Sequence, residues 1–430
     1  SLVIGQPDFT SSAVNQGGSV GPNTLANPWA VFSDGQRMYV SDFSNNRILI
    51  WNQIPTANNT PADVVIGQPN FTSSTHNQGS NTVAAANTIR GSEGIWSDGN
   101  KLIVADSGNN RVLIFNSIPT TNNASADVVI GQPDFASTAV NQGGAAEPNT
   151  LWSPVGVWVD NGKLFITDKN NNRILIFNSI PISNNALADL VIPNYGGISN
   201  MNTLTGIFTH NNKLFVSDHA NNRILIYNSV PTSDSAIPDI VIGQPDFDSG
   251  LANQGGNAAA NTLTAPRYIA TDGKRLYVSN EKDEGENNKN NNRILIFEDY
   301  EATATPGFTV NYPPESSGEK MRLSGNIVLG EYGKFDLRSP EVSINNQGFG
   351  PLTNFSKRQH SDHETIMEFF HEFEPWAGVA PKDQWTEGDG FTAHFKATSY
   401  QSRIETQEAF LFWPFTLDSV STEGAVPTFS

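Results

Sequence analysis

The chain has 430 residues, of which 43 are acidic and 25 are basic, so its formal net charge is −18 at pH 7. This charge argues against a nucleic-acid partner or an anionic membrane surface. The absence of cysteine excludes disulfides and thiolate metal sites, and no apolar run approaches the roughly 18 residues of a membrane span.

One sequence unit recurs five times within residues 1–310. Each copy contains Asn-Arg followed by three or four aliphatic residues, with the arginine at Arg47, Arg111, Arg173, Arg223 and Arg293. Each copy also contains Asn-Thr-Leu or Asn-Thr-Ile, beginning at Asn23, Asn87, Asn149, Asn202 and Asn261. From this Asn to the arginine there are 24 residues in the first three units, 21 in the fourth and 32 in the fifth. The recurrence predicts a repeat architecture with a constant core and variable loops.

The third unit shows the pattern of one repeat. Its short apolar runs, rich in Val, Ile and Phe, span residues 155–159, 163–167, 174–177 and 189–192. Turns that contain Asn, Gly, Asp and Pro separate them. Short runs of this kind predict strands, so we expect four antiparallel strands in each unit.

Four short strands repeated around an axis form the blades of a β-propeller, because one such sheet buries both faces only by stacking on its neighbours. The second run of a unit ends in an aromatic residue or Ile, then Val, a small residue and Asp, before Asn-Arg. This order stands at residues 39–42 before Arg47, 103–106 before Arg111 and 215–218 before Arg223. It resembles the NHL-repeat family. The resemblance implies a propeller over residues 1–310 but no single activity, since the family includes binding scaffolds and enzymes.

Residues 2–9, Leu-Val-Ile-Gly-Gln-Pro-Asp-Phe, match the fourth strand of the units that end at Gln68, Gln132 and Gln244. A fourth strand that precedes any first strand is expected to complete the last blade, so that no sheet edge stays open. Five units then give five blades. Residues 308–310 lie at the fourth-strand position of the fifth unit; if they take that edge, a sixth blade built from residues after 312 is the alternative.

The repeat ends near residue 312, and we expect a propeller of residues 1–311, a linker of residues 312–318 and a second domain of residues 319–430. Residues 366–374 and 391–399 alternate in polarity, and residues 409–417 are strongly apolar. Alternation with period two predicts an all-β, immunoglobulin-like β-sandwich. A helix over residues 361–373 is the alternative.

An aspartate ends the second strand in four units, and Asn280 takes its place in the fifth. A ring of carboxylates suits cations, but each aspartate stands near an Asn-Arg, where it can accept turn amide hydrogens or pair with the arginine of its own or a neighbouring blade. We therefore expect structural roles for Asp42, Arg47, Asp106, Arg111, Asp168, Arg173, Asp218, Arg223 and Arg293.

The fifth unit carries an acidic insertion at residues 281–289, in which Asp283, Glu284 and Glu286 are candidate calcium ligands. Two lysines and the lack of EF-hand spacing favour a solvated loop instead. We expect no required cofactor, with Ca²⁺ as the alternative.

Propeller enzymes that this fold resembles, such as amidating lyases and lactonases, hold a channel metal on several innermost strands. The corresponding positions here are apolar: Val31, Ile95, Val157, Ile207 and Ile269. In the C-terminal region, His363-Glu364 is followed by Met367 where a zinc-protease motif has its second histidine. A metal-dependent lyase or hydrolase is therefore the alternative to a non-enzymatic protein.

Three tryptophans beyond the repeats, Trp376, Trp385 and Trp413, have acidic residues in their neighbourhood. Aromatic faces of this kind can stack on sugar rings, which makes a carbohydrate-binding protein a further alternative. Aromatic packing in a core is the interpretation that we favour.

The connections from a fourth strand to the next first strand are long, at residues 6–27, 68–91, 132–153 and 244–265. Each contains Asn-Gln-Gly, at Asn15, Asn77, Asn141 and Asn253. The connection after the third blade is shorter and comprises residues 193–202. We expect the repeated tripeptide to be structural, and the loop-rich face of the propeller to be where a partner binds.

No signal peptide is present, and Ser1 falls inside a strand motif, so we expect a processed or truncated start. The abundance of Asn, Ser, Thr and Gly resembles bacterial extracellular repeat proteins. The leading prediction is a non-enzymatic extracellular or cell-surface protein that binds protein or polysaccharide without inserting into a membrane.

Overall fold

The computed structural model describes residues 1–81, 83–193, 201–272, 275–282 and 290–298, followed by eight separate strands between residues 304 and 411. Side chains are described as far as residue 297, apart from residues 281–290. The distribution of contacts gives two compact units. The first comprises Ser1–Pro238, Ile242–Gln244 and Asp248–Ile296, and the second comprises Asp239–Val241, Pro245–Phe247 and Phe297–Ser430.

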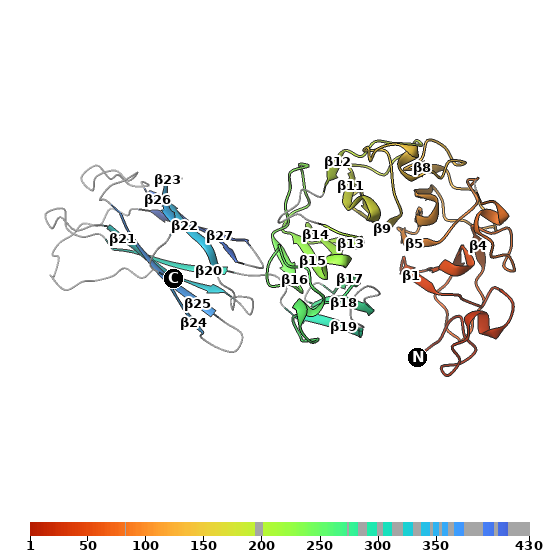
Figure 1. Cartoon of the computed structure of the whole chain (residues 1–430), viewed down its shortest axis with the longest axis horizontal. Coiled ribbons are helices and arrows are strands. Elements are labelled where there is room, and N and C mark those ends of the chain that lie inside the picture. Colours follow the sequence, from red (N-terminus) through yellow and green to blue (C-terminus); the bar gives the residue numbers. More distant parts are fainter. Residues whose placement is uncertain are drawn as a thin grey trace. The chain divides into compact units, whose positions relative to one another are not determined.

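The strands from β1 to β19 form the five predicted blades (Figure 1). Blade one consists of β1 (Pro28–Ser33), β2 (Met38–Asp42), β3 (Arg47–Trp51) and β4 (Val64–Ile66). Blade two consists of β5 (Ser92–Ser97), β6 (Leu102–Asp106), β7 (Arg111–Phe115) and β8 (Val128–Ile130). Blade three consists of β9 (Pro154–Asp160), β10 (Lys163–Asp168), β11 (Arg173–Phe177) and β12 (Leu190–Ile192).

Blade four consists of β13 (Leu204–His210), β14 (Lys213–Asp218), β15 (Arg223–Tyr227) and β16 (Ile240–Ile242). Blade five consists of β17 (Pro266–Thr271), β18 (Arg275–Lys282) and β19 (Asn290–Glu298). In blades one to four the strands are ordered as in the sequence, and every described pairing is antiparallel. The four-stranded blades that the sequence predicts are therefore confirmed.

The Asn-Arg motif shapes the turn between the second and third strands. In blade one, a 3-10 turn at Phe43–Asn45 is followed by Asn46 in the left-handed conformation, with φ at 52°. Asn110, Asn172 and Asn222 take the same conformation in the next three blades. Asparagine tolerates this region better than most residues, because its short polar side chain can bond locally. The arginine that follows begins the third strand opposite the strand-end aspartate.

The blades pack through apolar side chains and through glycines of the inner strands. Ile48 and Ile50 of blade one join a buried cluster with Val104 and Leu113 of blade two. At Gly156 the blades approach so closely that an added Cβ atom would lie 2.4 Å from the Thr205 carbonyl oxygen of blade four. Gly94 and Gly206 meet the next blade in the same way.

The closing strand does not pair as expected. Leu2, Val3 and Ile4 form no strand, and among the described residues the sheet of blade five has three strands. Residues 308–310 belong to β20 (Ala304–Asn311), which pairs with β21 (Met321–Leu329) and not with β19 in the described sheets. The expected competition for the edge of blade five is therefore not seen from either segment.

The second unit contains two four-stranded sheets. One has the order β20-β21-β25-β24, with β25 at Thr365–Phe373 and β24 at Phe355–Gln359. The other has the order β23-β22-β26-β27, with bounds Gln347–Pro351, Leu337–Ile344, Gly390–Ser399 and Arg403–Leu411. Residues 365–373 are thus strand and not the alternative helix. The immunoglobulin-like sandwich and the boundaries at 311 and 319 stay predictions.

The helices within the described ranges are 3-10 turns of three or four residues. In this part of the chain no helix is long and apolar enough to cross a membrane.

Candidate functional site

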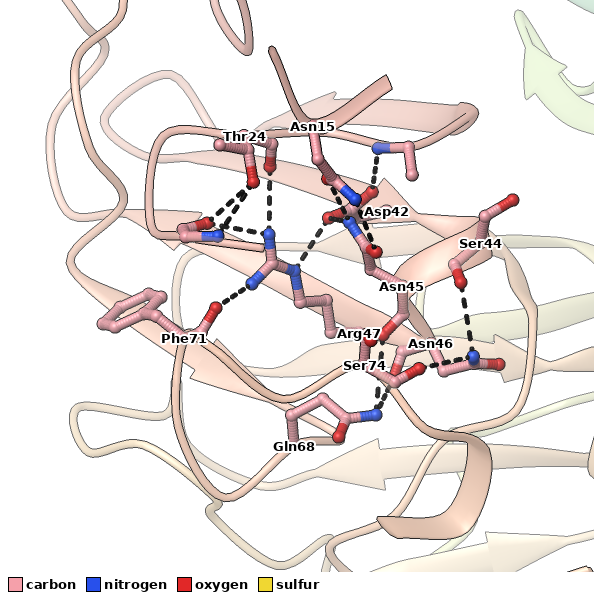
Figure 2. Close-up of polar contacts among 12 residues, drawn as sticks. Asn15, Thr24, Asp42, Ser44, Asn45, Asn46, Arg47, Gln68, Phe71 and Ser74 are labelled. Carbon is pink, nitrogen blue, oxygen red and sulfur yellow. Dashed lines mark hydrogen bonds and ion pairs between the residues drawn. The ribbon is translucent and has the colours of Figure 1, made fainter. Parts of the chain in front are cut away.

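The structure brings each predicted aspartate to the arginine of its own blade, and Figure 2 shows the pair of blade one. In blades one to four the arginine Nε donates to the aspartate Oδ2 at 2.6–2.8 Å, and both side chains are buried. The pairs are Asp42–Arg47, Asp106–Arg111, Asp168–Arg173 and Asp218–Arg223. Arg293 has Asn280 in place of the carboxylate, and its Nη2 donates to the Ala259 and Thr262 carbonyls at 2.8 and 2.9 Å.

The remaining polar atoms of each pair also bond within the chain. In blade one, the Arg47 guanidinium donates to the carbonyl oxygens of Gly21, Thr24 and Phe71 at 2.6–2.9 Å. Asp42 accepts the Ala26 amide hydrogen at 2.6 Å as well as the arginine. Burial raises the pKa of the Asp42 carboxyl, as it does for Asp168 and Asp218, and the adjacent guanidinium opposes the rise.

The Asn-Gln-Gly loops are tied to these pairs. Asn77 and Asn109 exchange two side-chain hydrogen bonds, at 2.9 and 2.8 Å, and Asn109 also donates to Asp106 at 2.8 Å. The same reciprocal amide pair forms between Asn15 and Asn45, Asn141 and Asn171, and Asn253 and Asn291. The glutamine of the first three loops reaches further: Gln16, Gln78 and Gln142 each donate to an asparagine side chain of the connection between the third and fourth strands. The repeated tripeptide therefore fixes the long loops to the blades.

A cluster at the centre of the propeller joins side chains from three blades. The Arg267 guanidinium of β17 lies over the Trp29 ring of β1, 4.0 Å from its centroid, and donates to Glu93 of β5 at 2.7 Å. The Phe43 ring stacks on the Trp29 ring, with the two ring centroids 3.9 Å apart. Glu93 and Arg267 are buried. Because blades two and five are not neighbours, this contact spans the centre of the ring.

Aromatic side chains make a second contact across the centre. Trp158 of blade three lies 6.5 Å from Phe32 of blade one and 6.3 Å from Phe208 of blade four, between ring centroids. Its indole Nε1 donates to Thr209 at 3.1 Å. Trp158 therefore joins blades one, three and four through their inner strands.

Sequence reasoning missed the central cluster for a specific reason. Val31 and the equivalent residues of the other blades were considered as the possible inward positions. The cluster residues stand two positions earlier, directly before the inner-strand glycine or the residue that replaces this glycine. This position holds Trp29, Glu93, Val155, Thr205 and Arg267. Its variation inside an otherwise repeated strand is the signal that could have found it.

The Asn-Thr-Leu sequence of the fourth unit lies three residues later in its repeat than the Asn-Thr-Leu sequences of the other units. The Asp42, Asp106 and Asp168 carboxylates accept the amide hydrogen of the residue 16 positions before them, and Asp218 accepts that of Asn202 at 2.7 Å. Asn202 is therefore equivalent to Trp152 and not to Asn149. The expected equivalence of Asn202-Thr203-Leu204 with the other Asn-Thr-Leu sequences was wrong, and so was the shorter spacing drawn from it.

The proposed ligand-binding residues of the other sites lie outside the described residues: Asp283, Glu284, Glu286, Trp376, Trp385 and Trp413. Residues 194–200, which make up most of the shortened connection after blade three, also lie outside the described residues. Across the side chains that the structure describes, no group of three or more His, Cys, Asp or Glu is placed to hold a metal ion.

Comparison with known families now decides what the repeats are. The family model described as NHL repeat matches residues 151–177, from the start of the third unit to the end of β11. The third unit of this β-propeller is an NHL repeat. The match covers the strand-end Asp168 and Arg173, so the buried pair belongs to the NHL repeat as it stands in this chain.

Among the matching solved structures is the crystal structure of glutaminyl cyclase from Myxococcus xanthus. It shares 10% identity with this chain at a TM-score of 0.30, over 63% of this chain and 94% of that one. This likeness does not bear on activity. No curated protein gave a significant match.

Proposed function

We propose that the protein is a non-enzymatic extracellular or cell-surface binding protein, and that its propeller recognises a protein or polysaccharide through the loop-rich face. The observation that carries this proposal is the combination of fixed loops with exposed apolar side chains. Val14, Val140 and Leu251 are exposed beside the Asn-Gln-Gly tripeptides, whose asparagines are held by reciprocal amide pairs.

Exposed apolar side chains are typical of recognition surfaces when they gather on one face. Here the long connections that carry Val14, Val140 and Leu251 emerge on the same face as the turns that follow the second strands. Trp152, exposed at the entry to β9, adds an aromatic side chain at the inner end of this face. Loops that are already ordered lose little conformational entropy on binding, which favours affinity.

The location at the cell surface rests on composition, and the proposal requires no cofactor. Calcium binding by Asp283, Glu284 and Glu286, and sugar stacking by Trp376, Trp385 or Trp413, stay predictions for the parts of the chain that carry them.

Matched surface variants test the proposal. The triple variant Val14→Ser, Val140→Ser and Leu251→Ser removes apolar surface from the loop-rich face. The control, Ile182→Ser with Leu187→Ser, alters exposed apolar residues outside these loops, in the connection between the third and fourth strands of blade three. The probes are a polysaccharide array and an extract of surface proteins from the source cells.

We expect the triple variant to lose at least tenfold in affinity for the ligand that the unaltered protein captures, and the control to keep it. Equal binding by all three proteins refutes the assignment to this face. A stoichiometric metal accompanied by turnover in a lyase and hydrolase screen refutes the non-enzymatic function.

A further inference from the structure

One position in each unit, two residues before the inner strand, is held by its backbone on both sides. In blade two the Arg90 amide donates to Asp106 Oδ1 at 2.7 Å, and the Arg90 carbonyl accepts the Gly108 amide hydrogen at 2.9 Å. The equivalent residues of blades one, three and four make the same two bonds; they are Ala26, Trp152 and Asn202. The backbone at this position is therefore fixed alike from blade to blade, while its side chain varies.

On blades two, three and four the side chain at this position reaches the surface. Ala26 of blade one and Thr264 of blade five are buried, with 3% and 0% of their surface exposed. By contrast, Arg90 and Asn202 are exposed, and Trp152 is 40% exposed. We call Arg90, Trp152 and Asn202 the entry row. Three successive blades thus present a guanidinium, an indole and a carboxamide at equivalent places.

Arg90 and Trp152 lie on the two sides of the turn that follows β6. A Cβ atom added to Gly108 of this turn would lie 2.8 Å from Arg90 Cγ, so the arginine stem covers the turn from one side. On the other side, Asn110 Oδ1 accepts the amide hydrogen of Ser153, the residue after Trp152, at 2.9 Å. An exposed cation and an exposed aromatic side chain are therefore separated by one short turn.

Neither of these two side chains is engaged by the rest of the described chain. Among the described residues, the Arg90 guanidinium forms no ion pair and the Trp152 indole Nε1 donates no hydrogen bond. The carboxylates at the ends of the adjoining second strands, Asp106 and Asp168, are buried against the arginines of their own blades. The positive charge of Arg90 therefore remains for a ligand to neutralise.

We infer that the entry row binds a polysaccharide that carries carboxylate groups, with Trp152 stacked on a sugar ring and Arg90 paired with a carboxylate. The inference rests on the proposed function and names the ligand class for the inner end of the loop-rich face. An indole face packs against the apolar face of a sugar ring, and a guanidinium fork matches the two oxygens of a carboxylate. The Asn202 carboxamide can donate to and accept from sugar hydroxyls. Because the three residues lie on successive blades, one extended polymer can contact all of them.

The charge of the whole chain limits how densely this ligand is charged. With a net charge of −18, the protein repels a polymer that carries an anion on every unit. A polysaccharide in which uronates are separated by neutral sugars keeps the contact with Arg90 and avoids most of this repulsion. We therefore expect such a polymer to bind better than dextran sulfate, which is densely charged.

An array of uronate-containing polysaccharides, among them hyaluronan, gellan and xanthan, tests the entry row in the full chain. Each polymer stands beside a form in which its carboxyl groups have been reduced to alcohols. The variants are Arg90→Gln and Trp152→Ala, with Trp152→Phe as the conservative change. Lys101→Gln is the matched control, since it removes one positive charge from the same blade at the other end of β6. The altered side chains leave the two backbone bonds of the entry position intact, so we expect unfolding in urea to be unchanged.

For the intact polymer that the unaltered chain binds most tightly, we expect Arg90→Gln and Trp152→Ala each to lower the affinity about tenfold or more. Trp152→Phe is expected to keep part of the affinity, and Lys101→Gln to keep all of it. Reduction of the carboxyl groups is expected to weaken binding to the unaltered chain but to cost Arg90→Gln nothing further, because the paired charge is already lost. Equal binding of intact and reduced polymers, binding of dextran sulfate as tight as that of the best polymer, or binding of no polymer overturns the inference.

The triple variant of Val14, Val140 and Leu251 separates this inference from the proposed function. A ligand whose affinity depends on those three residues but not on Arg90 or Trp152 overturns the entry row and leaves recognition by the loop-rich face in place. A captured protein that depends on both sets of residues overturns the polysaccharide class alone. A ligand that is insensitive to both sets overturns the inference and the proposed function together.

Discussion

The buried ion pair of blade two offers a quantitative test of the scaffold. Asp106→Asn removes the negative charge while keeping the size of the side chain. The Arg111 guanidinium, which is fully buried, is then left without its counter-charge. Removing one partner of a buried pair costs about 3–5 kcal/mol. Because asparagine keeps one acceptor oxygen for the Arg90 amide or the guanidinium, we expect the lower end of this range, about 3 kcal/mol.

Equilibrium unfolding in urea, followed by tryptophan fluorescence, measures this loss. Asp127→Asn is the matched control in the same blade, since Asp127 is exposed and accepts one backbone amide hydrogen, from Asn116, at 2.7 Å. We expect it to cost about 1 kcal/mol or less. Adding Arg111→Gln to Asp106→Asn is expected to cost less than the sum of the single changes, because the second change removes the uncompensated charge.

Equal losses in the Asp106 variant and the Asp127 control refute this reasoning. The carboxylate then contributes no more to stability than a surface turn does. If the Asp106 variant also loses binding of a cation while it stays stable, the repeated aspartates are ligands and not part of the scaffold.

Three further changes test the packing and the centre. Gly156→Ala places a Cβ atom 2.4 Å from a backbone carbonyl oxygen of blade four, and we expect a loss of about 1–3 kcal/mol, against almost none for Gly144→Ala, whose nearest atom is 3.8 Å away. Arg267→Met removes the cation above Trp29 and the salt bridge to Glu93; we expect lower stability at pH 7, partly restored at acidic pH where a carboxyl is neutral, in thermal scans. Burial raises the pKa of Tyr39 to about 12, so its stabilising contribution is complete below pH 10 and is lost as pH rises through about 12; ultraviolet titration against Tyr39→Phe measures that midpoint.

The repeated features of the fold could be predicted because each depends on local sequence. The four apolar runs of the third unit became β9 to β12 within a residue or two, since turn residues mark their ends. Asp168 was expected to accept turn amide hydrogens or to pair with an arginine of its own or a neighbouring blade. Pairing with Arg173 needs only a turn that places the two residues opposite each other, and the structure brings them to 2.8 Å.

Features that depend on contacts between blades could not be predicted. Asn202 was misaligned because a tripeptide match outweighed the 16-residue separation from Asp218, which is visible only through the hydrogen bond between them. Arg267 contacts Glu93, 174 positions away in the sequence, and Trp29, which is further still, at places where the repeat varies. The periodicity of the repeated sequence does not predict such a contact.

Hydrogen–deuterium exchange with and without the captured ligand tests the proposed recognition face most directly. Binding through the loop-rich face predicts new protection in the loops around Val14, Val140 and Leu251, with no change in the connection that contains Ile182 and Leu187. Protection confined to that connection, or to residues after 312, contradicts the assignment of recognition to the loop-rich face of the propeller.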